Sequence, residues 1–351
     1  MSLRRSLWRL LRAVLFRFDA ERAHRITVSL IRWSYRFGGG HLLRIASGAP
    51  AVSSQSVAPS GECEVFGMRF ASRVGLAAGF DKDAEIVPAL PSLGFGFAEI
   101  GTVTPRPQSG NDRPRLFRDL ERQCVFNRMG FNGLGAAVVA KRLESVRDRL
   151  PSAFRVGVNV GKNKDTPLEE AARDYAAAAA AFKSLADYIV INVSSPNTAG
   201  LRSLQAIESL HPIVDAVKEA IRGAKSPPLL LKLAPEVESE ELARIFAAAD
   251  RWGVDGWVLT NTLAGNREGL SGGWSGKVLT ELSRTRLEQA RAVTRLPIIS
   301  VGGIMDADEA ERRVRLGANL VQIYSGWIFG GPSFPVEISN RILIKNTEIK
   351  G

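Results

Sequence analysis

Eight short apolar segments, separated by longer stretches with helical periodicity, run through the chain from about residue 62 onward. The apolar segments, each of the length of a buried strand, are Arg73–Ala77, Phe97–Gly101, Phe154–Asn159, Tyr188–Asn192, Leu229–Leu233, Gly256–Thr260, Pro297–Val301 and Leu320–Tyr324. The helical stretches are Leu134–Leu150, Pro167–Ala186, Leu204–Arg222, Ser239–Trp252, Glu281–Thr294 and Ala307–Leu316. Eight strands, most of them followed by a helix, predict a (β/α)8 barrel, the TIM-barrel architecture, rather than an open sheet. The loops after the second, fourth and sixth strands are the longest, so we expect them to cover the mouth of the barrel.

The fourth predicted strand ends abruptly in polar residues. The run Ile189–Ile191 suits a strand buried on both faces, and the chain then continues Asn192-Val-Ser-Ser-Pro-Asn197. Pro196 lacks an amide hydrogen and disfavours helix at Ser195, so the strand must stop here. Two carboxamides and two hydroxyls are thus presented beyond the carboxyl end of a strand, where parallel α/β enzymes usually build their sites. The alternative is an ordinary polar turn that hydrogen-bonds to its own backbone.

Polar residues also follow the other predicted strands, and the carboxyl ends of all eight strands converge on one face of a barrel. They are Lys82, Thr102, Asn159 with Gly161-Lys-Asn-Lys164, Lys232, Thr260-Asn-Thr262, Gly302-Gly303 and Tyr324-Ser-Gly326. The glycines after the last two strands expose backbone amides at the usual phosphate cradle of such barrels, which indicates a phosphate-bearing ligand. The chain contains neither G-x-G-x-x-G nor G-x-x-x-x-G-K-[ST], which argues against a Rossmann dinucleotide site and a P-loop nucleotide site.

The first forty residues contain two amphipathic patterns with arginine on their polar sides. The apolar positions are Leu3, Leu7, Leu10, Leu11, Val14 and Phe18 in the first pattern, and Ala23, Ile26, Leu30, Trp33 and Phe37 in the second. Asp19 could cap the second helix, and Gly38-Gly-Gly40 ends it. Short arginine-rich helices with Leu, Trp and Phe on the other face are typical of interfacial membrane anchors. Other readings are a cleaved organellar targeting peptide, a helical hairpin packed on the main domain, and a nucleic-acid-binding segment.

The sequence therefore divides into an N-terminal helical module (1–45), a Ser/Pro/Gly-rich linker (46–61) and a catalytic barrel (62–351). A formal net charge of +11 points to nucleic acid, an anionic membrane surface or an anionic substrate as a partner. The two cysteines, Cys63 and Cys124, are far apart in the sequence, so we expect neither a metal site nor a disulfide framework. No apolar run reaches the roughly 18–20 residues of a transmembrane helix, so a membrane-bound form is expected to lie on the bilayer.

Taken together, these segments resemble the dihydroorotate dehydrogenases, and within them the membrane-associated, quinone-dependent class. The similar segments are Gly75–Lys82, Gly101–Gln108, Asn127–Asn132, Asn159–Asp165, Asn192–Asn197, Lys232–Pro235, Thr260–Thr262, Val301–Gly303 and Tyr324–Gly326. They follow one another between residues 62 and 340, and the amphipathic N-terminus is similar to the extension of the quinone-using class. One loop departs from the family pattern Gly-Gly-Leu-Ser-Gly, because this chain reads Gly269-Leu-Ser-Gly-Gly-Trp-Ser-Gly276.

The resemblance implies an FMN enzyme that oxidises (S)-dihydroorotate to orotate in pyrimidine biosynthesis and passes the electrons to a membrane quinone. By position, the residues expected to contact FMN are Ala78, Thr102, Asn159, Asn192, Lys232, Thr260, Gly276, Gly303, Tyr324 and Ser325. Those expected around the substrate are Lys82, Asn127, Arg128, Met129, Gly130, Phe131, Asn192, Asn197, Asn261 and Thr262. Ser195 is the expected catalytic base, and serine rather than cysteine at this place favours the quinone-using class.

The residue types fit this chemistry. Carboxamides suit a substrate ring that presents both N–H donors and C=O acceptors, and four converging asparagines would be unusual in a structural core. Lys232 is expected beside the flavin, where an ammonium would stabilise negative charge on the reduced ring. The alternative for Lys232 is a salt bridge to a carboxylate of the barrel. For Lys82 the alternative to substrate binding is a pairing with Asp81 or Asp83.

The implied partners are dihydroorotate and orotate, a membrane quinone, and an anionic membrane surface contacted by residues 1–40. We expect no nucleic acid and no metal. The implied location is that of a peripheral membrane protein on the cytoplasmic face of a bacterial-type inner membrane. Two other enzyme classes stay open at this point, a soluble-type dihydroorotate dehydrogenase that uses fumarate or NAD, and a flavin-free, phosphate-binding barrel lyase or isomerase. A nucleic-acid binder would explain the basic charge but leaves the polar strand ends without a purpose.

Overall fold

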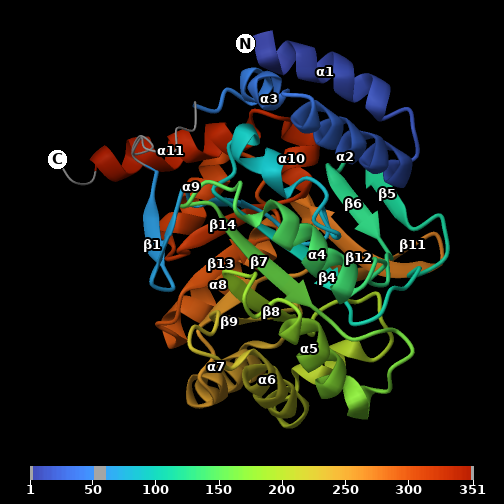
Figure 1. The fold of residues 1–351 in the computed structure, drawn as a ribbon, viewed down its shortest axis with the longest axis vertical. Helices are drawn as coiled ribbons and strands as arrows, with labels where there is room; N and C mark the ends of the chain where they lie inside the picture. Colours follow the sequence, from blue (N-terminus) through green and yellow to red (C-terminus); the bar gives the residue numbers. More distant parts are fainter. Residues whose placement is uncertain (1–2, 51–60, 349–351) are drawn as a thin grey trace.

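The computed structural model describes residues 3–50 and 61–348, and its centre is a closed barrel of parallel strands (Figure 1). The barrel strands are β3 Val74–Leu76, β4 Phe97–Val103, β7 Arg155–Val160, β8 Tyr188–Asn192, β9 Leu229–Leu233, β10 Gly256–Leu259, β13 Ile298–Val301 and β14 Leu320–Ile323. They pair in the order β10-β13-β14-β3-β4-β7-β8-β9, and β9 closes the ring by pairing with β10. The predicted (β/α)8 barrel is therefore confirmed.

Helices surround the barrel on the outside (Figure 1). In chain order they are the 3₁₀ helix η1 Val87–Leu93, α4 Ala136–Arg147, α5 Ala171–Ala180, α6 Ile207–Ile221, α7 Ser239–Trp252, α8 Thr280–Val293, α9 Ala307–Arg315, α10 Ser325–Gly330 and α11 Phe334–Glu348. Short 3₁₀ turns lie at η2 Leu168–Glu170, η3 Leu201–Gln205 and η4 Lys277–Leu279. The six predicted helical stretches correspond to α4 to α9. The first crossover instead contains η1, where Pro91 lies inside the helix and removes a backbone donor.

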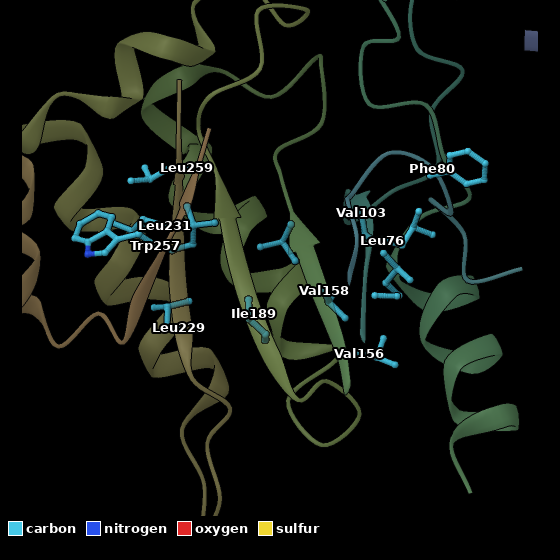
Figure 2. Close-up of a cluster of buried hydrophobic side chains, with 14 of the residues drawn as sticks. Leu76, Phe80, Val103, Val156, Val158, Ile189, Leu229, Leu231, Trp257 and Leu259 are labelled. Atoms are coloured by element: carbon cyan, nitrogen blue, oxygen red, sulfur yellow. The ribbon is translucent and has the colours of Figure 1, made fainter. Parts of the chain in front are cut away.

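Side chains along the barrel strands point alternately into the barrel and toward the helices. In β8, Tyr188 and Val190 belong to the interior cluster, whereas Ile189 and Ile191 belong to the larger cluster beneath the helices. Figure 2 shows part of this larger cluster along neighbouring strands. Because the period is two, Asn192 follows Val190 on the interior side, at the carboxyl end of the strand.

The amino-terminal end of the barrel is closed by a hairpin of β1 Cys63–Val65 and β2 Met68–Phe70. The Phe70 ring centroid lies 5.5 Å from that of Phe97, and the Phe66 centroid lies 6.1 Å from that of Tyr188. Gly157 makes room for this packing, since a Cβ there would come within 2.1 Å of the Tyr188 ring. Aromatic rings therefore fill the lower half of the barrel interior.

The loops after β4 and β10 combine into a second sheet over the other end. Its strands are β5 Leu116–Asp119, β6 Cys124–Asn127, β11 Leu263–Arg267 and β12 Leu270–Gly276, in the antiparallel order β11-β12-β6-β5. We predicted long covering loops here but not their strands. The pairing of β6 with β12 sets Asn127 opposite Gly273 and thereby joins the two loops.

Three helices precede the barrel and lie together at one end of the molecule (Figure 1). The two predicted helices are α1 Leu3–Leu15 and α2 Ala20–Arg36, and Asp19 caps α2 as expected, because its carboxylate accepts from the amide of Arg22 (3.0 Å). A third helix, α3 Gly40–Ser47, was not predicted, because the glycines that end the second helix are followed at once by the start of a new one. Of the predicted linker, residues 51–60 lie outside the described residues.

A buried ion pair fastens α2 to the barrel. The Arg115 guanidinium donates from Nε and Nη2 to the two carboxylate oxygens of Glu21 (3.1 and 2.9 Å), and Arg113 lies 3.0 Å from the same carboxylate. Burial alone would raise the pKa of Glu21, but the hydrogen bond and charge of Arg115, joined by Arg113, leave the pKa below its ordinary value. Arg115 also donates to the carbonyls of Ser109 (2.5 Å) and Asn111 (2.8 Å).

We expect Glu21→Gln to lower the free energy of unfolding by about 3 kcal/mol at pH 7, because Arg115 then stays buried without its charged partner. Thermal and denaturant unfolding measure the loss. Because the pKa of Glu21 is lowered in the folded state, its carboxylate stabilises the fold fully at pH values above its unfolded-state pKa. The difference in unfolding free energy between Glu21→Gln and the wild type should therefore vanish as the pH falls through the lowered pKa of Glu21.

The matched control for this variant is Glu85→Gln. Glu85 forms an ion pair at 2.8 Å with Arg32, which lies on α2 as Glu21 does. Both side chains of this pair are partly exposed, so the loss of unfolding free energy should be about 0.5 kcal/mol. Equal losses in the two variants would contradict the role assigned to the buried pair.

Candidate active site

A cavity of about 1010 Å³, including space open to solvent, lies at the carboxyl ends of the barrel strands. It brings together most of the residues predicted from the sequence. Its lining includes Ser195; the predicted cofactor residues Ala78, Thr102, Asn192, Lys232, Thr260, Gly276, Gly303, Tyr324 and Ser325; and the predicted substrate residues Lys82, Asn127, Met129, Gly130, Phe131, Asn197, Asn261 and Thr262.

Two predicted residues do not line this cavity. Asn159 is fully buried behind it, where its Oδ1 accepts from Thr102 Oγ1 (2.5 Å) and from Asn192 Nδ2 (3.1 Å). Asn159 therefore orients two cavity residues. Arg128 bonds a neighbouring segment of the chain through its backbone, since its carbonyl accepts from Asn111 Nδ2 (3.0 Å). Its side-chain Nε is buried without a hydrogen-bond partner.

The four predicted asparagines form two hydrogen-bonded pairs. Asn197 Nδ2 donates to Asn127 Oδ1 (2.8 Å), and Asn127 Nδ2 donates to the carbonyl of Gly273 (3.2 Å). Asn261 Nδ2 donates to Asn192 Oδ1 (3.2 Å). Asn197 Oδ1 is buried without a hydrogen-bond partner, which leaves an acceptor for a ligand in the cavity.

The two serines of the turn after β8 differ in their surroundings. Ser194 is fully buried and donates to Asn192 Oδ1 (2.9 Å), so it is fixed within the asparagine cluster. Ser195 lines the cavity, and its Oγ accepts from the backbone N–H of Asn197 (3.2 Å). An N–H donor aimed at this oxygen stabilises negative charge that develops on it when the hydroxyl proton moves.

The Lys82 ammonium hydrogen-bonds to Asn132 rather than to the adjacent acidic residues Asp81 and Asp83. Its Nζ donates to Asn132 Oδ1 (2.5 Å), whereas Asp81 accepts from the amides of Glu85 and Ile86 and Asp83 accepts from the amide of Leu134. Burial, with a smaller contribution from the positive charge of Arg115, lowers the pKa of Lys82 to about 8. Lys82 therefore offers the cavity a cation that titrates just above neutral pH.

Glycines shape the wall after β13. Gly303 has a φ of +73°, and a Cβ there would come within 2.3 Å of the backbone nitrogen of Thr280. Gly302 and Gly276 also have positive φ values, of +103° and +95°. The resulting turn brings bare backbone next to Ser325 in the cavity wall, as a phosphate cradle requires.

Sequence reasoning missed a carboxylate beneath the cavity. Glu99 of β4 is fully buried, and its Oε1 lies 3.5 Å from Lys232 Nζ, so the salt bridge considered as the alternative for Lys232 is present. Asn159 Nδ2 donates to Oε1 (2.8 Å) and Gln322 Nε2 donates to Oε2 (2.7 Å). A charged residue at an inward position of an apolar strand was the signal that could have revealed Glu99.

A second cavity, of about 1180 Å³ including space open to solvent, lies between the N-terminal helices and the barrel. Its lining is mainly apolar and includes Trp8, Leu15, Ile31 and Trp327, and Tyr324 lines both cavities. His24 also lines this cavity, with Nε2 2.8 Å from the carbonyl of Phe80, and burial lowers its pKa to about 4. The imidazole is therefore neutral at physiological pH.

Large apolar side chains are exposed on the N-terminal helices around this second cavity. They are Leu7, Leu10, Leu11, Val14, Phe18, Leu30, Trp33, Phe37, Leu42 and Ile45. In the part of the chain that the structure describes, each helix is too short or too polar to cross a bilayer. We call this exposed set the apolar face.

Comparisons with known proteins place the chain in a family. The family profile described as Dihydroorotate dehydrogenase matches residues 61–345. The chain is 45% identical to a protein of Acidithiobacillus ferrooxidans, across 95% of this chain and 93% of that one, and 43% identical to a protein of Thermobifida fusca, across 94% and 89%. Both are named dihydroorotate dehydrogenase (quinone).

Solved structures agree with the sequence relatives. The crystal structure of DHODH from Eimeria tenella in complex with ferulenol superposes with a TM-score of 0.83 at 34% identity, and covers 95% of this chain and 93% of that one. The ligand-free type from the same organism gives a TM-score of 0.83 at 33% identity, over 94% and 96%. On its matched sequence and its barrel, the chain belongs to the dihydroorotate dehydrogenase family of oxidoreductases.

Proposed function

We propose that the protein oxidises (S)-dihydroorotate to orotate, with FMN as the hydride acceptor and a membrane quinone as the final electron acceptor, in pyrimidine biosynthesis. The observation that carries this proposal is the convergence of Ser195, the paired asparagines and the glycine turns in one cavity. The family relatives named above, which are quinone-dependent by name, support the choice of acceptor.

The cavity residues fit FMN. The turn at Gly302 and Gly303, with Ser325 beside it, suits the phosphate, since a side chain at Gly303 would collide with the backbone of Thr280. Thr102, Asn192 and Lys232 are the groups that would hold the ring system. When bound, FMN supplies the hydride acceptor that no side chain can provide.

The substrate residues complement dihydroorotate. Its ring presents amide N–H and C=O groups, which the carboxamides of Asn127, Asn197 and Asn261 can match. The unpartnered Asn197 Oδ1 supplies an acceptor, and Lys82 supplies a cation for the substrate carboxylate. Ser195 is the proposed base: its Oγ takes the proton from the ring carbon as its own hydroxyl proton passes on to water or a neighbouring hydroxyl, and the backbone amide of Asn197 stabilises the negative charge that develops on Oγ.

The second cavity is the proposed quinone site. Its lining is apolar, as an apolar quinone requires, and it is built largely from the helices that carry the apolar face. Tyr324 lies between the two cavities, so a quinone here would be close to the flavin site without sharing it. His24 is neutral and suits an uncharged ligand.

The apolar face and the arginines of residues 1–40 are proposed to dock on an anionic membrane, at the cytoplasmic face of a bacterial-type inner membrane. Large apolar side chains would enter the lipid, and arginine would meet the headgroups. The protein would thereby lie where quinones dissolve.

The direct test is the visible spectrum of the purified protein and its response to substrate. We expect a flavin absorption that dihydroorotate bleaches in the absence of oxygen. Ser195→Ala should keep the flavin but slow this bleaching by about 10²- to 10⁴-fold, because the proton acceptor is lost. A correctly folded protein without flavin would refute the proposed function, and an unchanged bleaching rate in the variant would remove Ser195 from it.

Lys82 gives the reaction a pH dependence. Its ammonium is present below a pKa of about 8, so kcat/KM for the anionic substrate should fall as the pH rises through that value. Lys82→Arg should hold kcat/KM level up to about pH 10, because arginine stays protonated. Lys82→Met should be impaired throughout the pH range, and a fall near pH 8 that persists in Lys82→Arg would assign it to another group.

Membrane docking is tested by co-sedimentation with vesicles of phosphatidylethanolamine and phosphatidylglycerol. Leu10→Ser combined with Trp33→Ser, at side chains 70% and 62% exposed, should weaken vesicle binding at least about tenfold, because each residue loses apolar area that would enter the lipid. The matched control changes Val138 and Val293, which are 44% and 53% exposed on the barrel helices, to Ser. Equal binding by both variants would contradict docking through the apolar face.

A further inference from the structure

Three strands direct polar side chains to the carboxylate of a fourth inside the barrel. Glu99 comes from β4, Asn159 from β7, Lys232 from β9 and Gln322 from β14, and the three partners lie 2.7 to 3.5 Å from the Glu99 oxygens. All four side chains are buried, and Glu99 has no exposed surface. Below them lies the aromatic layer that contains Phe97 and Tyr188, so water does not solvate the carboxylate from that side.

Alternation along each strand explains why these residues meet. Phe97 belongs to the interior cluster, and Glu99 follows it two residues later. Leu230 precedes Lys232, and Leu320 precedes Gln322, by the same step. The layer of polar groups thus rests directly on a layer of apolar ones, and it forms the floor of the cavity, which Lys232 and Gln322 line.

Charge balance governs this floor. A buried ammonium without a partner holds its proton less tightly, and a buried carboxylate without one holds its proton more tightly. Tyr188, the titratable neighbour on β8, is buried, and burial raises its pKa well above the ordinary value, so it stays neutral. Asn159 and Gln322 are neutral at all pH values, so the charge of Lys232 is balanced by Glu99.

We propose that Glu99 is a positioning residue that holds Lys232 as an ammonium at the cavity floor and thereby sets how strongly the bound flavin attracts electrons. This proposal rests on the proposed FMN function. A reduced flavin carries more negative charge than an oxidised one, so an ammonium beneath it favours reduction. The carboxylate behind that ammonium reduces the effect.

The Glu99 carboxylate also fixes the orientation of the Asn159 carboxamide. Asn159 Nδ2 donates to Glu99, so Asn159 Oδ1 must face the opposite way. There it accepts from Thr102 and Asn192, two residues that line the cavity. Glu99 therefore orients groups on two sides of the proposed flavin site.

Glu99→Gln tests the proposal with little change in shape. The new amide can be accommodated, because a flip of the Gln322 amide would offer Oε1 as its acceptor, and the neighbouring Tyr188 hydroxyl can accept from the Gln322 nitrogen instead. At pH 6 we expect the reduction potential of the bound flavin to rise by about 30 mV or more, which is a tenfold change in the equilibrium constant of a two-electron couple. The rise should shrink with increasing pH, since Lys232 without its carboxylate loses its proton more easily.

The matched control is Glu311→Gln. Glu311 is also a buried carboxylate in an ion pair, with Arg315 at 2.6 Å, but it lies on α9 outside the barrel, so the flavin potential should not change. If Glu99→Gln and wild type have the same potential between pH 6 and 9, the proposal is wrong. Flavin in the purified wild type separates this failure from failure of the proposed function, which a flavin-free protein would show.

A measurement on the wild type keeps the proposal testable if Glu99→Gln does not fold. Because the Glu99 carboxylate lies 3.5 Å from Lys232 Nζ, we expect the wild-type potential to follow the slope of the flavin itself between pH 6 and 9. A break that disappears in Lys232→Met would mean that Lys232 titrates in this range, and would overturn the proposal.

Discussion

Inside the barrel, a layer of charged and amide side chains rests on a layer of aromatic rings, and the site depends on this contact. The β1–β2 hairpin and the rings of Phe97 and Tyr188 fill the lower half. Polar groups such as Glu99 cannot be hydrated from below and must satisfy one another. They therefore adopt one arrangement, in which Lys232 and Gln322 reach the cavity.

A chain of hydrogen bonds also connects the N-terminal helices to residues proposed to bind substrate. Glu21 holds Arg115, and Arg115 binds the carbonyl of Asn111. Asn111 Nδ2 in turn donates to the carbonyls of Arg128 (3.0 Å) and Asn197 (3.2 Å). The helices that carry the apolar face are thus part of the framework that positions two loops of the active-site cavity.

The sequence predicted the barrel and most of the cavity, because apolar strands and helical repeats leave a clear period and polar strand ends must converge. It did not predict the antiparallel sheet over the mouth, since the strand Leu270–Gly276 is rich in glycine and lacks alternation. Glu99 was missed because its role depends on partners from three other strands. Asn159 lies behind the cavity wall rather than in its lining, because its side chain bonds Thr102 and Glu99.

Tyr324 lines both cavities, the first of which contains the polar strand-end residues while the second is mainly apolar. On the proposed assignment of the cavities, a water-soluble reductant would bind in the first and a lipid-soluble oxidant in the second. Neither has to leave before the other arrives, and neither competes for the other's contacts. In such an arrangement the two half-reactions would take place in separate cavities, and electrons would pass through the part of the protein that lies between them. Lipid and aqueous solvent would then never share one cavity.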